Sequence, residues 1–286
     1  MRVERFSLYE LLPDLAPIEV IDVGAGQMRD DLPLYYHLAR AGGARITGYE
    51  PNLNNCVALN QRYGRPHRFF PHFVGDGGVA KFYQTNSPFT GSLFLPNRPL
   101  LDLFSDVGAV TQLVAVEDVQ TVRLDDNPDI ADVDFLKLDV QGSELAILRG
   151  AETALAAAVV VQTEVCFVEL YQGQPLFADL DAHLRSRGFA FQHLEPFGTA
   201  TVKPPLPVAV GHGDPGRIQQ LWSDALYIKD LLRLEQLGDD KLRKLAVILH
   251  DLYGICDIAH HCLEIVDRRG GTDVAPRYAA LIAPAG

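Results

Sequence analysis

Short apolar runs alternate along the chain with stretches whose apolar residues recur at helical spacing. The apolar runs predict strands at residues 20–23, 45–49, 68–74, 114–124, 133–139, 159–165, 189–194 and 224–228. The helical stripes predict helices across residues 34–41, 53–61, 145–155 and 176–184. Two parallel strands that are neighbours in a sheet need a crossover connection, and the predicted helices supply it here. The alternation therefore predicts a doubly wound α/β fold, in which helices cover both faces of a mostly parallel sheet.

Two segments fall outside this alternation. Residues 84–112 are less regular and predict an insertion that folds over a substrate, because long excursions from a core are commonly functional. After Asp230 come leucine-rich helical stripes, interrupted near Gly238 and Gly254. We therefore expect a domain over residues 1–230 and a C-terminal helical extension over 231–286. The stripes must bury against something, either the domain itself or a second copy in a homodimer.

The most informative strand ends in a glycine turn, Asp22-Val23-Gly24-Ala25-Gly26. Residues 30–34 follow, with a capping aspartate and a proline suited to the first turn of a helix. A strand, a Gly-x-Gly turn and a helix together open many nucleotide-binding α/β units. The third glycine of a dinucleotide fingerprint is absent, since Arg29 occupies its position, and no Gly-Lys-Ser/Thr of a phosphate loop follows.

Carboxylates around this turn suit a ligand with an adenosine end and a cationic group. Glu50, followed by Pro51 at the tip of the second strand, is placed to accept both hydroxyls of a ribose. Asp22 adds negative charge that repels a pyrophosphate and suits a sulfonium, and Asp76 in a glycine-rich loop is placed to bond an adenine amine. S-adenosylmethionine is such a ligand, and its expected site comprises Asp22, Gly24, Ala25, Gly26, Glu50, Pro51 and Asp76.

Each of these carboxylates also has a purely structural interpretation. Asp22 would brace the glycine turn, Glu50 would cap the helix that starts near Asn52, and Asp76 would form an Asx turn.

Composition and charge narrow the range of partners. The 286-residue chain is 48% hydrophobic and 22% charged, which suits a globular protein with a sizeable core. Its formal net charge of −12 argues against a nucleic-acid partner. No apolar run reaches the ~20 residues of a membrane span, and residues 1–15 lack a signal-peptide core. The four cysteines show no zinc spacing, so we expect reduced thiols and a cytoplasmic protein.

Four blocks of the sequence resemble the FkbM family of methyltransferases: Ile21–Gly26, Gly48–Pro51, Asp134–Gly150 and Val161–Phe191. The resemblance covers roughly residues 18–230, and the third of these blocks is specific to that family. It implies S-adenosylmethionine as methyl donor and a Rossmann-like class I methyltransferase sheet of seven strands in the order 3-2-1-4-5-7-6. It also implies O-methylation of a sugar or polyketide hydroxyl. One departure is Gln27-Met28, where family members often have Asn-Ile-Gly.

The implied strand order has its switch point between strands 1 and 4, so Gly24 and Asp139 would lie on opposite lips of one cleft. Methyl transfer from a sulfonium needs an oriented acceptor oxygen and, for a weakly acidic hydroxyl, a group that takes its proton. We therefore expect Asp139 to be the base or acceptor-orienting group, with Gln141 and Glu164 positioning the acceptor. Lys137, on the same strand face, is expected to pair with a carboxylate. The alternatives are that Asp139 braces its turn, or that Asp139 and Glu164 hold a divalent metal; we expect no metal site.

Three functions are compatible with these features. The best supported is an S-adenosylmethionine-dependent O-methyltransferase that acts on a small molecule or glycan. A nicotinamide-dependent oxidoreductase would share the architecture, but the missing third glycine disfavours it. A binding module without turnover would also share this architecture. The presence of all four expected site residues argues against that function: Asp22, Gly24, Glu50 and Asp139.

Overall fold

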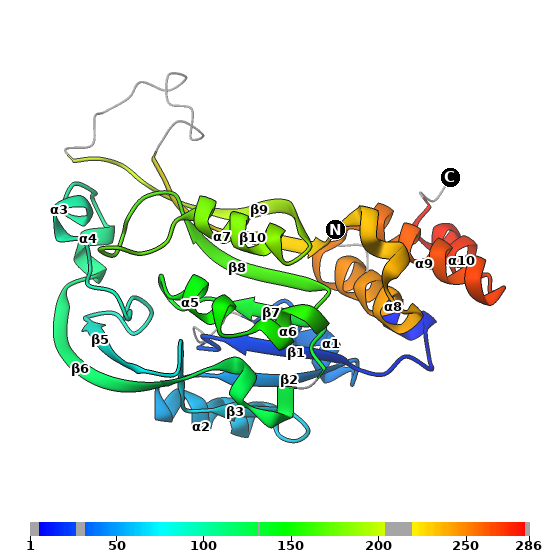
Figure 1. The fold of residues 1–286 in the computed structure, drawn as a ribbon, viewed down its shortest axis with the longest axis horizontal. Helices are drawn as coiled ribbons and strands as arrows, with labels where there is room; N and C mark the ends of the chain where they lie inside the picture. The colour runs from blue at the N-terminus through cyan, green and yellow to red at the C-terminus, as the bar shows by residue number, and fades with distance from the viewer. Residues whose placement is uncertain (1–5, 27–31, 131, 204–218, 284–286) are drawn as a thin grey trace.

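The computed structural model describes residues 6–26, 32–130, 132–203 and 219–283, and a seven-stranded sheet forms its centre (Figure 1). β10 runs antiparallel to both of its neighbours, and the other strands of this sheet run parallel to one another. This arrangement confirms the expected order 3-2-1-4-5-7-6. The strands, from one edge to the other, are β3 (Arg68–Phe70), β2 (Ala44–Tyr49), β1 (Ile18–Val23), β7 (Phe135–Leu138), β8 (Val160–Cys166), β10 (Gln219–Lys229) and β9 (Phe189–Ala200).

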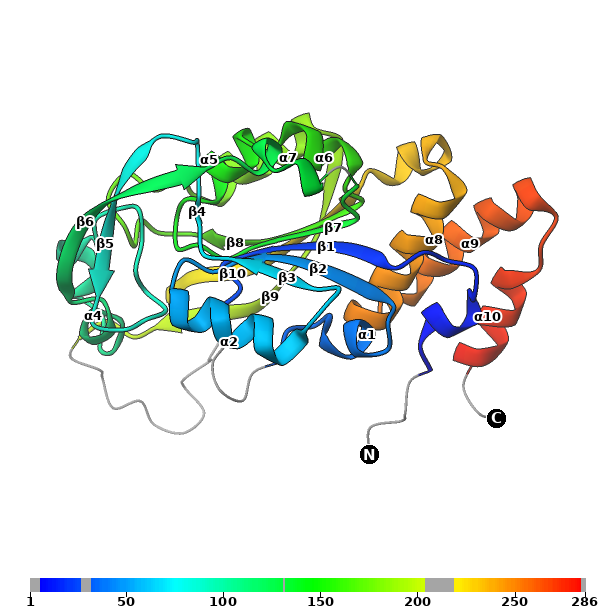
Figure 2. The same ribbon diagram turned by 90° about the horizontal axis from the view of Figure 1, so that it is seen from below.

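Helices cover both faces of this sheet, as Figure 2 shows. One face carries α1 (Tyr36–Arg40) and α2 (Leu53–Tyr63), and the other carries α5 (Glu144–Arg149), α6 (Glu152–Ala157) and α7 (Phe177–Ser186). The doubly wound architecture predicted from the alternation is therefore confirmed.

Two of the predicted helices were wrong in extent. The stripe at 145–155 is not one helix, because the Asp125 carboxylate accepts hydrogen bonds from the backbone N–H groups of Thr153 and Ala154 and so starts α6 as a separate helix. The first helix begins at Tyr36 rather than Leu34, which is exposed. Tyr35 instead turns into the core, where its hydroxyl bonds the Asp22 carboxylate. Residues 30 and 31 lie outside the described ranges.

The predicted single strand at 68–74 was also wrong, because it divides between two sheets. β3 pairs at the edge of the large sheet, while β4 (Phe73–Val74) joins a three-stranded sheet with β5 (Val79–Thr85) and β6 (Leu113–Val122). Pro71 lies between β3 and β4, where its missing N–H costs no ladder hydrogen bond. Between β5 and β6 the chain forms α3 (Arg98–Leu101) and α4 (Val107–Val110), at the end of the molecule opposite the C-terminal helices (Figures 1 and 2).

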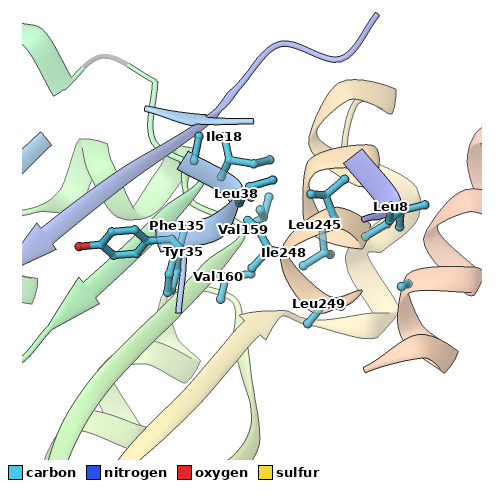
Figure 3. Close-up of a cluster of buried hydrophobic side chains, with 14 of the residues drawn as sticks. Leu8, Ile18, Tyr35, Leu38, Phe135, Val159, Val160, Leu245, Ile248 and Leu249 are labelled. Carbon is cyan, nitrogen blue, oxygen red and sulfur yellow. The ribbon is translucent and has the colours of Figure 1, made fainter. Parts of the chain in front are cut away.

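The C-terminal stripes form helices that pack on the domain, which is the first of the two expected outcomes; the homodimer stays a prediction. Leu245, Ile248 and Leu249 face Val159 and Val160 of the sheet within one buried cluster (Figure 3). No helix in the described ranges combines the length and apolar character needed to cross a bilayer. The C-terminal elements are η5 (Leu231–Gln236), α8 (Asp239–Val247), the π-helical turn η6 (Ile248–Tyr253), α9 (Cys256–Gly270) and α10 (Val274–Ile282).

Polar contacts fix these helices to the start of β7 and to the segment before β1. Asp134, fully buried just before β7, accepts from Lys241 Nζ at 2.6 Å and Lys244 Nζ at 2.7 Å. Beside the short helix η1 (Leu8–Leu11), the Asp251 carboxylate accepts from the Ser7 hydroxyl and from the Leu8 N–H at 2.7 Å. These bonds join the first described residues of the chain to the π-helical turn η6. The remaining short helices are η2 (Leu124–Asp126) and η3 (Pro128–Ile130).

On one face of the sheet, the side chains change from apolar to polar toward the carboxyl ends of the strands, and the polar part forms the candidate site. Side chains alternate between the two faces of a strand, so Val20 and Asp22 share a face. Val20 is buried in the apolar cluster with the C-terminal helices, whereas Asp22, two residues nearer the carboxyl end of β1, lines a cleft. β7 and β8 repeat the change, with Phe135 followed by Lys137 and Val160 followed by Gln162. The helices therefore cover the apolar half of this face and leave the polar half open.

Candidate active site

A cleft of about 980 Å³ opens at the carboxyl ends of β1, β7 and β8. This volume lies at the upper end of the ~300–1,000 Å³ typical of small-molecule sites. Residues 88–93 of the predicted insertion contribute to its wall, and that this segment covers a substrate stays a prediction. Of the expected site residues, the cleft lining includes Asp22, Gly24, Ala25, Gly26, Glu50, Pro51, Asp139, Gln141 and Glu164.

The glycine turn after β1 is held against the turn after β7. Gly24 has φ +82°, and a Cβ built on it would lie 1.9 Å from the carbonyl oxygen of Asp139. Only glycine fits such a close approach of two backbones. The N–H groups of Gly24 and Ala25 both donate to the Tyr49 carbonyl oxygen at 3.0 Å, which fixes the turn to the end of β2. Gly24 and Asp139 therefore meet at one cleft, as the implied strand order required.

Glu50 faces the glycine turn from the end of β2. A Cβ added to Gly26 would lie 2.7 Å from Glu50 Oε2, so the absence of a side chain there leaves room beside this carboxylate. Glu50 Oε1 accepts from the Asn52 N–H at 2.8 Å, while the Asn52 side chain itself caps α2 by accepting from Asn54 and Asn55. Burial raises the pKa of Glu50. One carboxylate oxygen of Glu50 thus stabilises the turn that leads into α2, and the other faces the cleft.

Asp22 lies in the floor of the cleft and is only 2% exposed. Its carboxylate accepts from the Tyr35 hydroxyl and, at 3.2 Å, from Lys137 Nζ, which confirms the expected pairing of Lys137 with a carboxylate. Burial by itself lowers the pKa of Lys137, but the carboxylates of Asp22 and Asp139 outweigh it and raise that pKa. Lys137 is therefore a permanent cation that neutralises Asp22. Sequence reasoning missed Tyr35, which carries no motif.

Gln141 bridges the two carboxylates expected to act on the acceptor. Its Nε2 lies 3.0 Å from Glu164 Oε2 and 3.3 Å from Asp139 Oδ1. Its Oε1 lies 3.0 Å from the Tyr171 hydroxyl, and its carbonyl oxygen accepts from Ser92 Oγ at 2.5 Å. Gln141 also has φ +59°, a conformation uncommon for a residue with a side chain. Because the surrounding bonds maintain this strained backbone, the position of the amide is tightly determined.

Two buried glutamates beside this bridge resist ionisation. Burial raises the pKa of Glu164 well above its ordinary value, and the negative charges of Asp139 and Glu144 raise it further. Burial also raises the pKa of Glu144 to about 7, even though its carboxylate accepts from the N–H groups of Val140 and Gly142. Asp139 is therefore accompanied by acids that are inclined to remain protonated near neutral pH.

The structure places Asp76 outside the cleft lining. Its Oδ1 accepts from the Gly78 N–H at 2.8 Å, which is the Asx turn that the sequence left open as the alternative. Within the described part of the chain, no group of three or more His, Cys, Asp or Glu side chains is arranged to hold a metal ion.

Several residues that line the cleft were not predicted from the sequence. Gln162 Nε2 donates to Asp224 Oδ2 at 2.8 Å, and Gln162 Oε1 accepts from the Tyr253 hydroxyl at 2.7 Å. Trp222 and His193 line the same wall. The one available indication was polar residues at alternate positions of otherwise apolar strands, Gln162 and Glu164 in β8 and Asp224 in β10.

We expect the substitution Glu164→Gln to raise the melting temperature more at pH 8 than at pH 5. Because the folded-state pKa of Glu164 is raised, the folded protein retains a proton that the unfolded chain releases above ~4.3. Stability therefore falls as pH rises from the unfolded pKa toward the folded one, and glutamine removes this loss. Thermal melts at the two pH values measure the difference.

Glu117→Gln is the matched control, since Glu117 is exposed on β6 and should show no pH-dependent gain. A gain from Glu164→Gln of the same size at both pH values would contradict the prediction.

Comparison with known proteins gives one family match. Residues 22–191 match the model of the methyltransferase FkbM domain. No curated protein matches the sequence.

Among solved structures, magnesium protoporphyrin IX methyltransferase from Synechocystis PCC 6803 with bound SAM is 14% identical, with 78% of this chain and 76% of that chain covered and a TM-score of 0.36. The N-terminal domain of EvdMO1 with SAH bound is 9% identical, with coverages of 78% and 77% and a TM-score of 0.36. The 16S rRNA (adenine(1408)-N(1))-methyltransferase from Catenulisporales acidiphilia is 12% identical, with coverages of 80% and 96% and a TM-score of 0.33. Because the identities and TM-scores of these structures are low, the assignment of this chain to a family rests on the match to the family model, and its fold class on the strand order.

Proposed function

This chain belongs to the family of methyltransferase FkbM domains, and from that membership we propose that it transfers a methyl group to a hydroxyl oxygen of a small molecule or glycan. It is an S-adenosylmethionine-dependent methyltransferase with the class I sheet of that fold. Family membership decides against a nicotinamide-dependent oxidoreductase. We propose oxygen as the atom methylated and a small molecule or glycan as the acceptor.

The residues around the glycine turn fit the methyl donor. S-adenosylmethionine supplies a methyl carbon already activated by its sulfonium. In this chain, Gly24 and Gly26 keep side chains out of the space between β1, β2 and β7. Glu50 presents one carboxylate oxygen beside Gly26, at the strand tip where an acidic residue accepts ribose hydroxyls. With Pro51 and Ala25 also in the lining, these residues form the proposed donor half of the cleft.

The bridge formed by Gln141 is the observation that carries the proposed chemistry. An activated methyl group needs an acceptor oxygen held in line with it and a group that takes the hydroxyl proton. Asp139, next to the glycine turn, is the proposed base. Gln141 Nε2 donates to both the Asp139 carboxylate and the Glu164 carboxyl group, so the two groups are held next to one another. Glu164 and Gln141 are proposed to position the acceptor hydroxyl.

The acceptor is proposed to be a small molecule or glycan because the cleft has the dimensions of a small-molecule site and the net charge of −12 disfavours nucleic acid. Incubation with S-adenosylmethionine carrying a ¹³C-methyl group and a library of sugars and polyketides tests the proposal. The carbon shift of a new O-methyl group distinguishes it from N- or C-methylation. Methylation found only on nitrogen or carbon would overturn the proposal.

We expect Glu50→Ala to weaken S-adenosylmethionine binding tenfold or more. A hydrogen bond to a charged group contributes roughly 1.5–3 kcal/mol, and the variant removes the carboxylate that faces the proposed ribose position. Titration calorimetry measures the dissociation constant. Glu152→Ala is the control, because Glu152 lies at the start of α6, outside the cleft. An unchanged dissociation constant for Glu50→Ala, with the fold intact by circular dichroism, would remove Glu50 from the donor site.

A further inference from the structure

A chain of hydrogen bonds crosses the cleft floor from the C-terminal extension to β10. The Tyr253 hydroxyl donates to Gln162 Oε1 at 2.7 Å, and Gln162 Nε2 donates to Asp224 Oδ2 at 2.8 Å. Because the amide oxygen of Gln162 accepts from the Tyr253 hydroxyl, its amide nitrogen is directed toward Asp224. Within the described residues, Asp224 Oδ1 has no hydrogen-bond partner. The arrangement fixes one oxygen of Asp224 and leaves the other available in the cleft lining.

Asp224 lies beside a second carboxylate across the strands. In the antiparallel register of β10 and β8, Asp224 is directly opposite Glu164. Side chains in directly opposite positions have Cβ atoms about 4.5–5.5 Å apart, and like charges in such a pair are destabilising. Burial and the negative charge of Asp139 raise the pKa of Asp224. The two carboxyl groups gain no mutual stabilisation from this position, so we expect the pair to serve in binding.

The balance of charge in the cleft indicates which chemical groups it accepts. Of the described lining residues, Lys137 is the one lysine or arginine, and it is paired with Asp22. No lysine or arginine of the described lining is therefore left to bind a phosphate or carboxylate, and the other basic side chains there are the imidazoles of His72 and His193. Asp224, Glu164 and Asp139 instead offer hydrogen-bond acceptors. The wall beside Asp224 is completed by Trp222, two residues away on the same face of β10, which offers an apolar ring surface.

Resting on the proposed function, we infer that Asp224 recognises the acceptor through a hydrogen-bond donor, an ammonium or hydroxyl group, next to the hydroxyl that is methylated. The acceptor then carries no phosphate or carboxylate near that hydroxyl. Gln162 and Tyr253 are positioning residues that hold Asp224 through the bonds described above. The π-helical turn η6 of the C-terminal extension, which lies outside the family match at 22–191, is thereby part of acceptor selection.

The test measures binding of four defined probes to the protein saturated with S-adenosylhomocysteine. The probes are methyl glucoside, its 2-amino analogue, methyl glucuronide and glucose 6-phosphate, titrated by saturation-transfer NMR. We expect the neutral and amino probes to bind at least tenfold more tightly than the two anionic probes. Asp224→Asn should weaken the amino probe roughly tenfold, the effect of one charge-assisted hydrogen bond, while calorimetry shows unchanged affinity for S-adenosylhomocysteine.

Two tyrosine variants separate positioning from general stability. Tyr253→Phe and Tyr278→Phe each remove one hydroxyl from the extension, and Tyr278 bonds His250 rather than a cleft residue. Only Tyr253→Phe should reduce the preference for the amino probe over the neutral one. Anionic probes that bind as tightly as the others, Asp224→Asn without effect, equal effects of the two tyrosine variants, or no probe binding at millimolar concentration would each overturn the inference. Failure of the wild type to bind S-adenosylhomocysteine would instead overturn the donor site of the proposed function.

Discussion

Asp139→Asn is expected to lower turnover roughly 10²- to 10⁴-fold, the contribution of a positioned general base. Asparagine keeps the shape of the side chain and an oxygen that can still accept from Gln141 Nε2, but it carries no charge and cannot take the acceptor proton. The glycine turn approaches the backbone carbonyl of Asp139 rather than its side chain, so donor binding should survive. Single-turnover methyl transfer to the identified acceptor, together with the donor dissociation constant, measures the two effects separately.

Asp76→Asn is the matched control for this variant, because Asp76 also lies in a turn after a strand but outside the cleft lining. It should leave turnover near the wild-type rate. Near-normal turnover for Asp139→Asn would make Asp139 a structural residue. Activity that chelators abolish and added divalent ions restore would move the chemistry to a cation held by Asp139 and Glu164.

Asp134→Ala is expected to destabilise the protein by about 3–5 kcal/mol, the cost of breaking a buried ion pair by removing one partner. Asp134 is fully buried and accepts from Lys241 Nζ, Lys244 Nζ and the Glu19 N–H. Its loss leaves Lys244, itself only 5% exposed, with no buried carboxylate to neutralise it. Urea unfolding followed by circular dichroism measures the change in the free energy of unfolding.

Asp132→Ala provides the comparison on the same lysine. Asp132 accepts from Lys241 Nζ at 2.7 Å, but its side chain is 62% exposed, and exposed ion pairs contribute about 0–1 kcal/mol. The two aspartates therefore share Lys241 as a partner and differ in burial and in the further bonds that Asp134 accepts from Lys244 and the Glu19 N–H. Losses of equal size from both variants would show that burial does not determine the contribution of Asp134.

The centre of the sheet was predictable because its strands are buried on both faces. β1, β7 and β8 are mostly apolar and almost entirely buried, so their position and the polar residues near their carboxyl ends followed from the pattern. The resemblance to a known family supplied the strand order. The residues proposed to bind the donor could be identified for the same reason, since Asp22, Gly24 and Glu50 lie at or just beyond the carboxyl ends of strands.

The part of the cleft proposed to bind the acceptor, around Gln162, Asp224 and Tyr253, was not predictable because its geometry depends on tertiary contacts. β9 and β10 extend well beyond the predicted 189–194 and 224–228, through polar sequence whose strand state comes from antiparallel pairing with bulges. Tyr253 reaches Gln162 only because a π-helical turn and the packing of the C-terminal helices bring it there. No local pattern relates residues 91 positions apart. The start of α1 was missed similarly, since the contact of Tyr35 with Asp22 sets it.

The bonds between the segment before β1 and the π-helical turn impose an order on biosynthesis. Asp251, which accepts a hydrogen bond from the Ser7 hydroxyl, is synthesised 244 positions after Ser7. At roughly 5–20 residues per second, that partner follows on the order of ten seconds or more afterwards. Leu8, fully buried in the finished protein, cannot complete its contacts with the C-terminal helices before they are made. The native core at this end of the sheet thus closes after translation of the C-terminal helices, in a late step that involves contacts of very long sequence separation.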